Sequence, residues 1–502
     1  MKRKADEYRK PLLHTRVDPV SFVNIKNDEA AYQNCKVIKI QDVSFPIVLG
    51  HEEIIVDFGN HYTGYLNIEL CGDKNSCIPD SPTVINFEFA EMPIELVKEF
   101  VYSKESLSVG WLQSESKSVA FMPYKGSLER RYSFRYLKLK RTDTANFKIC
   151  LTALYIDAVS AVNAETVKPL RSGDDLLDRI DAMCVNTLKE CEQDVFEDGP
   201  KRDRRLWIGD LRLQALVDYQ TFNNISLIKR CIYLFAENLT KEGLVTPCVF
   251  PDTPPYIDQW IYLDYSLCLA LCLSDYLENT GDIQLPLELY DIALNQIKYA
   301  ERNFDRKNGK INAPFFIDHG NYNRDVAALG YLSYVLVHTI LLSEKEGKPT
   351  EWLKEIYKEV TDSLLRYRDI KTKLFITDDG EISWQSQVWA ALSGALSKEE
   401  CRQLLKKTIE SDLQIRMSSP FMTHYYLEAL YKCDEQEYAL EYIKNYWGAM
   451  LTAGYDCCPE CFDTRNDMLS PYANIVLNSA CHAWSCTPAY WIRKYHAEEK
   501  AK

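Results

Sequence analysis

The chain has 502 residues, which is more than one ordinary hydrophobic core holds, so we expect two or three domains. Hydrophobic residues make up 46% and charged residues 26% of the sequence, a balance that excludes an intrinsically disordered chain. The formal net charge is −14. Because phosphate groups are bound by basic surfaces, this charge argues against a nucleic acid or an anionic membrane as the partner.

The N-terminal ten residues are mostly charged and contain no apolar core of a signal peptide. The longest uninterrupted apolar run, around Ser266 to Leu273, is much shorter than a membrane span. We therefore expect a cytoplasmic protein. In that compartment the seventeen cysteines are expected to be reduced thiols, many of them buried as small hydrophobic side chains.

Short runs rich in β-branched and aromatic residues occupy the first third of the chain, separated by Gly, Asn, Asp or Pro. They lie at Ile54–Phe58, Leu66–Leu70, Thr83–Phe89, Ser118–Tyr124, Tyr132–Lys140 and Phe147–Ile156. Such strands are typical of an antiparallel β-sandwich. We predict a β-sandwich domain over residues 1–165, in which residues 1–45 form a weakly patterned extension that wraps the sandwich.

From Ser172 onward the apolar residues follow a helical period, which begins with a Ser-x-x-Asp capping signal. Twelve candidate helices start near residues 174, 210, 225, 258, 286, 325, 350, 384, 398, 419, 435 and 471. Helices joined by short loops pack as antiparallel hairpins, so residues 166–502 are predicted to form an all-helical domain. Three tryptophans are expected in its core: Trp384, Trp389 and Trp491.

The segment from Glu197 to Asp210 holds four carboxylates, four cations and a tryptophan. Gly199-Pro200 breaks any helix at its front, and a helical pattern follows Asp210, so its carboxylates lie on a loop that leads into a helix. Burying like charges this close together is costly unless pairing or protonation relieves it. The segment is therefore either a solvated charge run or a functional site, and its position on a loop favours the site.

Five cysteines gather near the end of the chain: Cys457, Cys458, Cys461, Cys481 and Cys486. Cys458 and Cys461 form a Cys-x-x-Cys pair, but the downstream pair is separated by four residues and matches no common zinc spacing. We therefore expect neither a bound metal nor a disulfide among these residues.

At this point the sequence resembles glycoside hydrolase family 78, the inverting α-L-rhamnosidases, from about residue 50 onward. The matching motifs are Val56-Asp57-Phe58-Gly59-Asn60 with Gly64-Tyr65, Phe89-Ala90-Glu91, Phe134-Arg135-Tyr136, the acidic segment Asp198 to Asp210, Trp447-Gly448, Gly454 with Glu460, and Ser479 to Ser485. The resemblance implies a β-sandwich followed by an (α/α)6 barrel, whose inner mouth holds the active site, and it implies no cofactor.

The resemblance also assigns roles to individual residues. It implies that Glu460 is the general base and Asp203 the general acid. It further implies that the sugar pocket is lined by Asp198, Arg202, Trp207, Asp210, Trp260 and His482. Two positions depart from the family pattern. Arg204 stands where the commoner form of the motif has a glutamate, and His319 follows Asp318 where many members have tryptophan.

These roles fit inverting hydrolysis, in which a protonated carboxyl and an ionised carboxylate stand about 6.5–9.5 Å apart with water between. The partner is then a carbohydrate, a terminal α-L-rhamnose or a similar deoxy-sugar. Asp198 and Asp210 remain alternatives for the acid. Two other functions also remain open: an exo-hydrolase for another sugar such as a uronic acid, and a catalytically silent glycan-binding protein. The oligomeric state is open, with a homodimer as one candidate.

Overall fold

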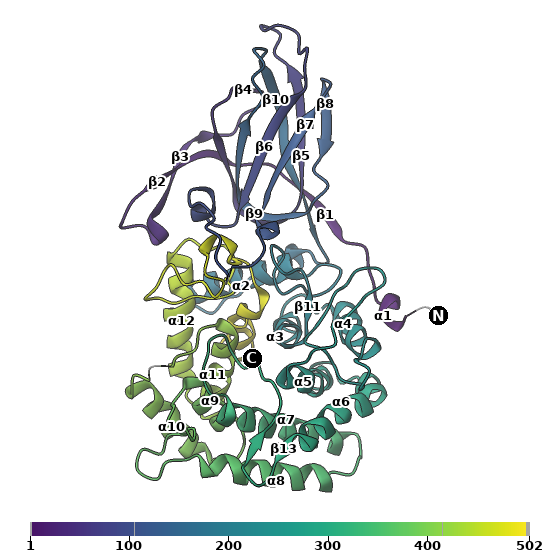
Figure 1. Cartoon of the computed structure of the whole chain (residues 1–502), viewed down its shortest axis with the longest axis vertical. Coiled ribbons are helices and arrows are strands. Elements are labelled where there is room, and N and C mark those ends of the chain that lie inside the picture. Colours follow the sequence, from purple (N-terminus) through teal and green to yellow (C-terminus); the bar gives the residue numbers. More distant parts are fainter. Residues whose placement is uncertain (1–2, 105, 414, 498–502) are drawn as a thin grey trace.

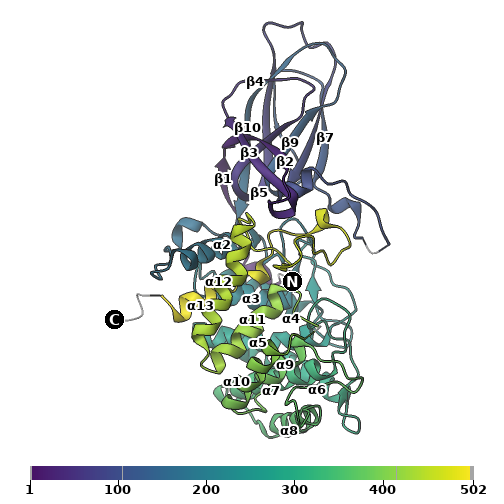
Figure 2. The ribbon, with the colours of Figure 1, turned by 90° about the vertical axis from the view of Figure 1, so that its left-hand side faces the viewer.

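The computed structural model describes residues 3–104, 106–413 and 415–497. The chain forms a β domain and a helical domain that pack end to end along the long axis of the molecule (Figure 1). In the turned view, loops from the C-terminal part of the chain, coloured yellow, lie between the β domain and the helices (Figure 2). Segments far apart in the sequence therefore meet where the two domains join.

Ten strands form the β domain, and every pair that they make is antiparallel. They are β1 (Leu13–Val17), β2 (Ser21–Asn27), β3 (Cys35–Asp42), β4 (Ile47–Leu49), β5 (Ile54–Gly72), β6 (Thr83–Ala90), β7 (Ser114–Val119), β8 (Tyr124–Ser127), β9 (Tyr132–Arg141) and β10 (Ile149–Ser160). The main path through the sheet runs β1-β10-β5-β9-β6-β7. Alternate residues of β6 are buried, as expected for a strand with one face on a core.

Strand β5, with 19 residues, organises this domain, because it pairs with β9 along its first part and with β10 from Gly64 to Gly72. A register shift between Asp57 and Tyr62 divides the strand. The first half also pairs with β2, and the second half also pairs with β8. A single long, irregular strand thus carries what the sequence suggested were two strands, at Ile54–Phe58 and Leu66–Leu70.

The structure corrects two further expectations for the β domain. The strand expected at Ser118–Tyr124 does not exist as such, because Met122-Pro123 separates β7 from β8 and proline cannot donate to a strand ladder. The N-terminal extension is also more ordered than expected. It contributes β1, β2 and β3, and the short helix α1 (Lys4–Glu7) packs on the helical domain against α4 (Ile225–Glu237).

The helical domain alternates outer and inner helices. The outer helices are α2 (Asp175–Cys191), α4, α6 (Gln284–Arg302), α8 (Glu351–Arg366), α10 (Lys398–Glu410) and α12 (Gln436–Thr452). The inner helices are α3 (Ile208–Asp218), α5 (Leu263–Thr280), α7 (Asp325–Lys345), α9 (Trp384–Leu392), α11 (Pro420–Lys432) and α13 (Pro488–Tyr495). From α3 to α11 each inner helix contacts the next, and Tyr431 of α11 stacks on Trp491 of α13. Helix α2 contacts both α12 and α13, which closes the ring.

Eleven of the twelve expected helices start within about five residues of their expected positions, and the last one is wrong. The segment near residue 471 is a loop with one 3-10 turn, Ile475–Leu477, and the sixth inner helix begins only at Pro488. The segment starts at Pro471. Further along it, the backbone carbonyl groups of residues 476–478 accept hydrogen bonds from the side chains of Lys201 and Arg202. Its apolar residues therefore mark a buried loop and not a helix.

Helix α7 is long and apolar enough to cross a membrane by length and composition, although no uninterrupted apolar run of that length occurs in the sequence. Charged residues at its two ends and polar residues within it interrupt the apolar run. In the structure 83% of its most apolar window is buried inside the protein. It is therefore a central helix of the barrel. A helix that is apolar on nearly all sides is expected in the interior of a folded domain.

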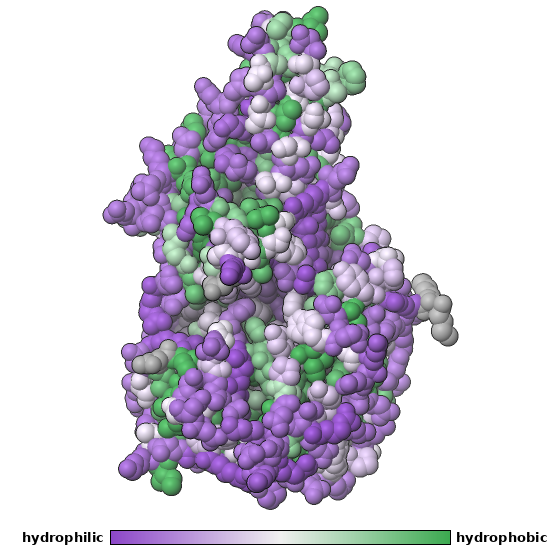
Figure 3. Space-filling view, in the orientation of Figure 1, coloured by the Kyte–Doolittle hydropathy of each residue, from purple (hydrophilic) through white to green (hydrophobic). Residues whose placement is uncertain are grey.

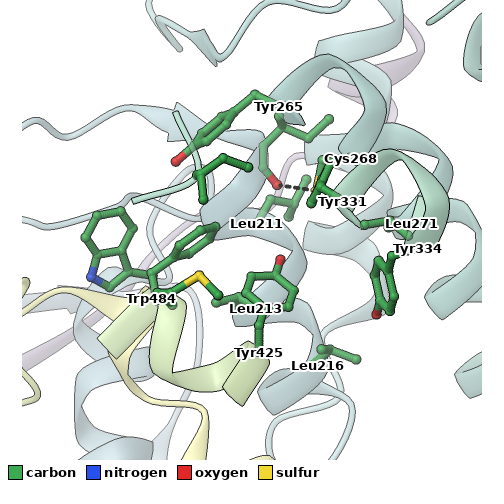
Figure 4. Packing of buried hydrophobic residues seen from close by; sticks show 14 of the residues in the cluster. Leu211, Leu213, Leu216, Tyr265, Cys268, Leu271, Tyr331, Tyr334, Tyr425 and Trp484 are labelled. Carbon is green, nitrogen blue, oxygen red and sulfur yellow. Dashed lines mark hydrogen bonds between the residues drawn. The ribbon is translucent and has the colours of Figure 1, made fainter. Parts of the chain in front are cut away.

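The inner helices meet in an aromatic and aliphatic core. Figure 4 shows Leu211 and Leu213 of α3 packed near Tyr265, Tyr425 and Trp484, which come from α5, α11 and the C-terminal loop. The three tryptophans predicted as core are buried, with exposed fractions of 7% for Trp384, 1% for Trp389 and 3% for Trp491. This core fixes the positions of the loops that leave the inner helices at the mouth of the barrel.

Candidate active site

A pocket with a volume of about 240 Å³ opens at the mouth of the barrel. The molecular surface is hollowed below the β domain on the face shown in Figure 3. The pocket is lined by Asp198, Arg202, Asp203, Trp207, Asp210, Trp260, Tyr262, Tyr265, Phe316, His319, Glu460, Tyr472, His482 and Trp484. All eight residues that the sequence predicted for the site line this one pocket.

The acidic loop between α2 and α3 is held in place by Asp198. Its carboxylate accepts hydrogen bonds from the backbone nitrogens of Asp203, at 2.9 Å, and Arg205, at 3.0 Å. Gly199 follows, where a Cβ atom would lie 2.6 Å from the carbonyl oxygen of Arg202. Burial, with a further contribution from the Asp203 charge, raises the pKa of Asp198 to about 8. Both oxygens of Asp198 thus serve to shape the loop.

Arg202 connects the acidic loop to the C-terminal loop, which is the segment between α12 and α13. Its Nε donates to the carbonyl oxygen of Leu477 at 2.8 Å, and its guanidinium lies 4.1 Å from the centre of the Tyr472 ring. Its Nη2 donates to the Glu460 carboxylate, while its Nη1 lies 3.8 Å from Asp203 Oδ1. One buried cation therefore stands between the two carboxyl groups that the sequence proposed as base and acid.

Glu460 is buried in the pocket wall, with 4% of its surface exposed. Its carboxylate accepts from Arg202 and from the hydroxyl of Tyr472, and His319 Nε2 lies 3.6 Å from Oε1. The indole of Trp484 donates to the Glu460 backbone carbonyl at 3.0 Å. Burial would raise the pKa of this carboxyl, but Arg202 and His319 outweigh burial and hold its pKa well below the usual range. Glu460 is ionised at neutral pH.

Asp203 has a different environment. Its side chain is 22% exposed, and its nearest cations are Arg202 and Arg205, each 3.8 Å away. Burial raises the pKa of the Asp203 carboxyl more than these two guanidinium groups lower it, and the negative charge of Glu460 adds to the rise. Two carboxyl groups in one pocket thus have pKa values displaced in opposite directions, a pattern typical of an acid and base pair.

Asp210 and His482 form a second polar group in the pocket. Asp210 lies in the first turn of α3, and its Oδ1 is 3.7 Å from His482 Nδ1. Neither atom has a hydrogen-bond partner in the described part of the chain. Burial raises the pKa of Asp210 well above its usual value and lowers the pKa of His482 to about 3. Buried polar atoms without partners in a pocket are suited to bind the hydroxyl groups of a ligand.

Two models of known protein families match the chain. The glycosyl hydrolase family 78 alpha-rhamnosidase N-terminal domain matches residues 19–158, and the bacterial alpha-L-rhamnosidase 6 hairpin glycosidase domain matches residues 165–495. The chain belongs to glycoside hydrolase family 78. The expected fold class, an antiparallel β domain followed by a six-hairpin (α/α)6 barrel, is confirmed, and so is the expected enzyme class, a glycoside hydrolase.

Several solved rhamnosidase structures resemble this chain. A rhamnosidase from Klebsiella oxytoca with rhamnose bound is 32% identical over 98% of this chain and 97% of its own length, with a TM-score of 0.93. A rhamnosidase from Bacillus sp. GL1 is 22% identical over 90% of this chain and 47% of its own, with a TM-score of 0.73. No curated protein sequence matches the chain.

Arg204, the main departure from the family 78 motif, does not line the pocket. Its φ of 61° turns the backbone, and its guanidinium donates to the carbonyl oxygens of Pro200, at 2.9 Å, and Arg131, at 2.7 Å. Arg131 belongs to the β domain and immediately precedes β9. Arg204 thus ties the acidic loop to the β domain, while the neighbouring Asp203 lines the pocket.

His319, the second departure, is part of the pocket wall of this family 78 member. Its ring makes edge contacts with Phe316, Trp484 and Tyr472 at centroid distances of 5.2, 5.7 and 6.3 Å. The preceding Asp318 does not line the pocket. It accepts hydrogen bonds from Ser419 Oγ at 2.6 Å and from the Ser418 backbone at 2.9 Å, and so fixes the loop that carries His319.

Aromatic side chains cover the rest of the pocket. Trp260 is the most exposed of them, at 41%, and it contacts the rings of Tyr262 and Trp207 at 5.0 and 6.2 Å. Sequence reasoning missed four residues that line the pocket: Tyr262, Tyr265, Phe316 and Tyr472. The first two flank the start of α5 close to Trp260, which is a usable signal. Tyr472 lies in the segment mistaken for a helix, where no pattern identifies it.

Proposed function

We propose that this family 78 enzyme releases terminal α-L-rhamnose from a glycoside with inversion at the anomeric carbon. Glu460 acts as the general base and Asp203 as the general acid. The observation that carries the proposal is the placement of both carboxyl groups in one pocket on either side of Arg202, and the opposite displacement of their pKa values agrees with it. An inverting hydrolase needs one ionised and one protonated carboxyl on opposite sides of the sugar.

The proposed reaction follows from these protonation states. Asp203 gives its proton to the glycosidic oxygen as the bond to the anomeric carbon breaks. A water molecule attacks that carbon from the opposite face and gives a proton to Glu460, whose carboxylate retains lone pairs beyond those used by Arg202 and Tyr472. One proton enters the leaving group and one leaves the water, so the enzyme returns to its starting state after proton exchange with solvent.

The pocket supports a deoxy-sugar. Its volume of about 240 Å³ suits one sugar ring, and its aromatic wall suits the apolar edge and methyl group of rhamnose. The solved Klebsiella oxytoca relative has rhamnose bound. A uronic acid would need a free cation, but the arginine in the lining, Arg202, is already paired with Glu460. We therefore favour rhamnose over the carboxylated sugar that the sequence left open.

The remaining lining residues have binding roles in this proposal. Asp210 and His482, which carry unpartnered buried atoms, bind sugar hydroxyl groups. Trp207 and Trp260 form walls against the ring, and Asp198 fixes the loop that presents Asp203. This division separates residues that move protons from residues that position the sugar.

Turnover of aryl α-L-rhamnoside, followed by NMR of the released sugar, tests the proposal. We expect the β-anomer as the first product, and no release from the aryl glucuronide used as a control. First formation of the α-anomer would show retention and overturn the roles given to Glu460 and Asp203. No release at all, together with thermal stabilisation by free rhamnose, would instead show a silent binding protein.

A further inference from the structure

A cluster of metal-ligating side chains lies outside the active-site pocket, where the β domain meets the C-terminal loops. His61 comes from β5, and Cys457 and Cys481 come from the loops after α12. One ligand atom from each of these residues lies within 4.8 Å of the other two. The exposed fractions are 3%, 1% and 0%, so the cluster is closed to solvent.

Two buried polar atoms at this cluster have no hydrogen-bond partner among the described residues. One is Nδ1 of His61 and the other is Oε2 of Glu190, which belongs to α2 and is 2% exposed. These two atoms are 4.0 Å apart. Because an unpaired polar group in a protein interior is costly, two such atoms facing each other indicate a missing ligand.

The other nitrogen of His61 is already occupied. Its Nε2 lies 3.0 Å from Glu91 Oε1 and 2.9 Å from Ser133 Oγ. With the Nε2 proton donated to the carboxylate, Nδ1 presents a lone pair to the two sulfur atoms. A histidine held by a carboxylate on its far nitrogen is the usual arrangement of a zinc ligand.

The hydrogen bonds around the two sulfur atoms are also consistent with zinc ligation. Asn186 Nδ2 donates to Cys457 Sγ at 3.3 Å, a contact that favours a thiolate at that position. The backbone nitrogen of Ala480, beside Cys481, donates to Glu91 Oε2 at 2.6 Å. The carboxylate that holds His61 thus also holds the loop that presents the second sulfur.

We propose that this cluster binds one zinc ion through His61 Nδ1, Cys457 Sγ, Cys481 Sγ and Glu190 Oε2. Two sulfurs, one imidazole and one carboxylate are a donor set that zinc accepts with tetrahedral geometry. A tetrahedral zinc ion holds such atoms about 3.3 to 3.8 Å apart. The His61 nitrogen and the two sulfurs lie within 4.8 Å of one another, so side-chain movements of about 1 Å bring these three into that range. Glu190 Oε2, 4.0 Å from His61 Nδ1, moves toward the two sulfurs to complete the site. Binding releases the two thiol protons to solvent.

The charges around the site suit this ion. Two thiolates and one carboxylate exceed the zinc charge by one, and Lys189 Nζ lies 2.7 Å from Glu190 Oε1, where it balances the excess. Glu91 shares a cation with Glu95, since Lys201 Nζ lies 3.9 Å from Glu91 Oε2 and 2.6 Å from Glu95 Oε2.

The position of the site gives it a structural consequence. Cys457 stands three residues before Glu460, and Cys481 immediately precedes His482. A zinc ion here fastens the two segments of the C-terminal loop that carry Glu460 and His482 to α2, through Glu190, and to the β domain, through His61. The ion touches no reacting atom, so its ligands are positioning residues. The inference revises the expectation of no metal, which considered only the spacing of neighbouring cysteines.

Metal analysis of untagged, freshly purified protein tests this inference, and it does not depend on the identity of the sugar. We expect zinc at one equivalent per chain. After chelation and reconstitution with Co²⁺, we expect the visible absorption bands of tetrahedral cobalt and the charge-transfer bands of thiolate ligation. Wild-type protein that contains no zinc and takes up neither metal when reduced would overturn the proposal.

Matched variants then locate the ion. Cys457→Ser and Cys481→Ser should lose zinc, whereas Cys458→Ser should retain it, because the Cys458 sulfur packs against Cys184 at 3.7 Å outside the cluster. If the ligand variants fail to fold, the cobalt spectrum of the wild type still decides. Full zinc content in both ligand variants, or a Cys457–Cys481 disulfide in protein alkylated at lysis, would refute the site.

Discussion

Arg202 and Glu460 form a buried ion pair between the loop that precedes α3 and the loop that follows α12. The exposed fractions of their side chains are 3% and 5%. The two loops belong to opposite ends of the helical domain in sequence, so the pair forms only when the ring of helices closes. Breaking one member of such a pair leaves an uncompensated charge in the interior. The same contact therefore supports both the ionisation of the proposed base and the closure of the pocket.

The first prediction concerns Glu460. Glu460→Gln keeps the shape of the side chain and can still accept from Arg202, but it cannot take a proton from water. We expect kcat to fall by about 10²-fold or more on every substrate, the scale on which positioned acid and base groups contribute. Initial rates on an aryl rhamnoside and on a natural disaccharide measure this effect. Glu437→Gln, on the exposed face of α12, is the matched control and should leave both rates unchanged.

The second prediction separates the acid from its neighbours. Asp203→Asn should retain much more activity on an activated aryl rhamnoside than on a disaccharide, because an aryl leaving group needs little protonation. The ratio of the two penalties is the measurement. Equal penalties would remove Asp203 as the acid and direct attention to Asp198 or Asp210.

Much of this site follows from sequence because its residues lie in short motifs. Five predicted site residues lie in the loop that leads into α3 and in the first turn of that helix, so they reach the pocket together: Asp198, Arg202, Asp203, Trp207 and Asp210. The barrel helices are also predictable, because each has a continuous helical period. The features that could not be predicted depend on contacts between residues far apart in the sequence.

Tyr472 and the proposed zinc ligands illustrate what sequence spacing cannot reveal. The helical apolar pattern near residue 471 comes from a buried loop, where tertiary contacts with Lys201 and Arg202 replace intrahelical hydrogen bonds. His61 and Cys457 are separated by most of the chain, so no local motif joins them. Strand β5 is a further case, since its length depends on having different partners along its two halves.

The third prediction is a pH dependence. Burial raises the pKa of Glu460, whereas Arg202 and His319 lower it, and the net displacement is downward. His319→Phe keeps a ring but removes one of the lowering partners, so the pKa of Glu460 should rise. The acidic limb of the profile of kcat/KM against pH should then move to higher pH, because the base is lost to protonation earlier. His338→Phe, at the far side of the barrel from the pocket, should leave that limb in place.

The same displacement has a consequence for stability. The folded-state pKa of Glu460 lies below the usual glutamate value of 4.5, so its ionised form stabilises the fold at pH values above 4.5. This stabilisation is lost as the pH falls through the lower folded-state pKa. Chemical denaturation of the wild type and Glu460→Gln between pH 7 and more acidic values should show the difference in unfolding free energy shrinking toward acid. A constant difference would contradict the assigned direction.

The fourth prediction distinguishes a wall of the pocket from its core. Trp260 is 41% exposed, so Trp260→Ala should leave the unfolding free energy nearly unchanged and mainly raise KM for rhamnosides. Trp389 is 1% exposed, and Trp389→Ala should lower the unfolding free energy by about 3–5 kcal/mol, as other large-to-small changes of buried aromatic residues do. Denaturant titrations and steady-state kinetics on both variants make the comparison. If Trp260→Ala lowered kcat as strongly as Glu460→Gln while KM stayed constant, the ring would interact mainly with the transition state, and its role as a passive wall would be wrong.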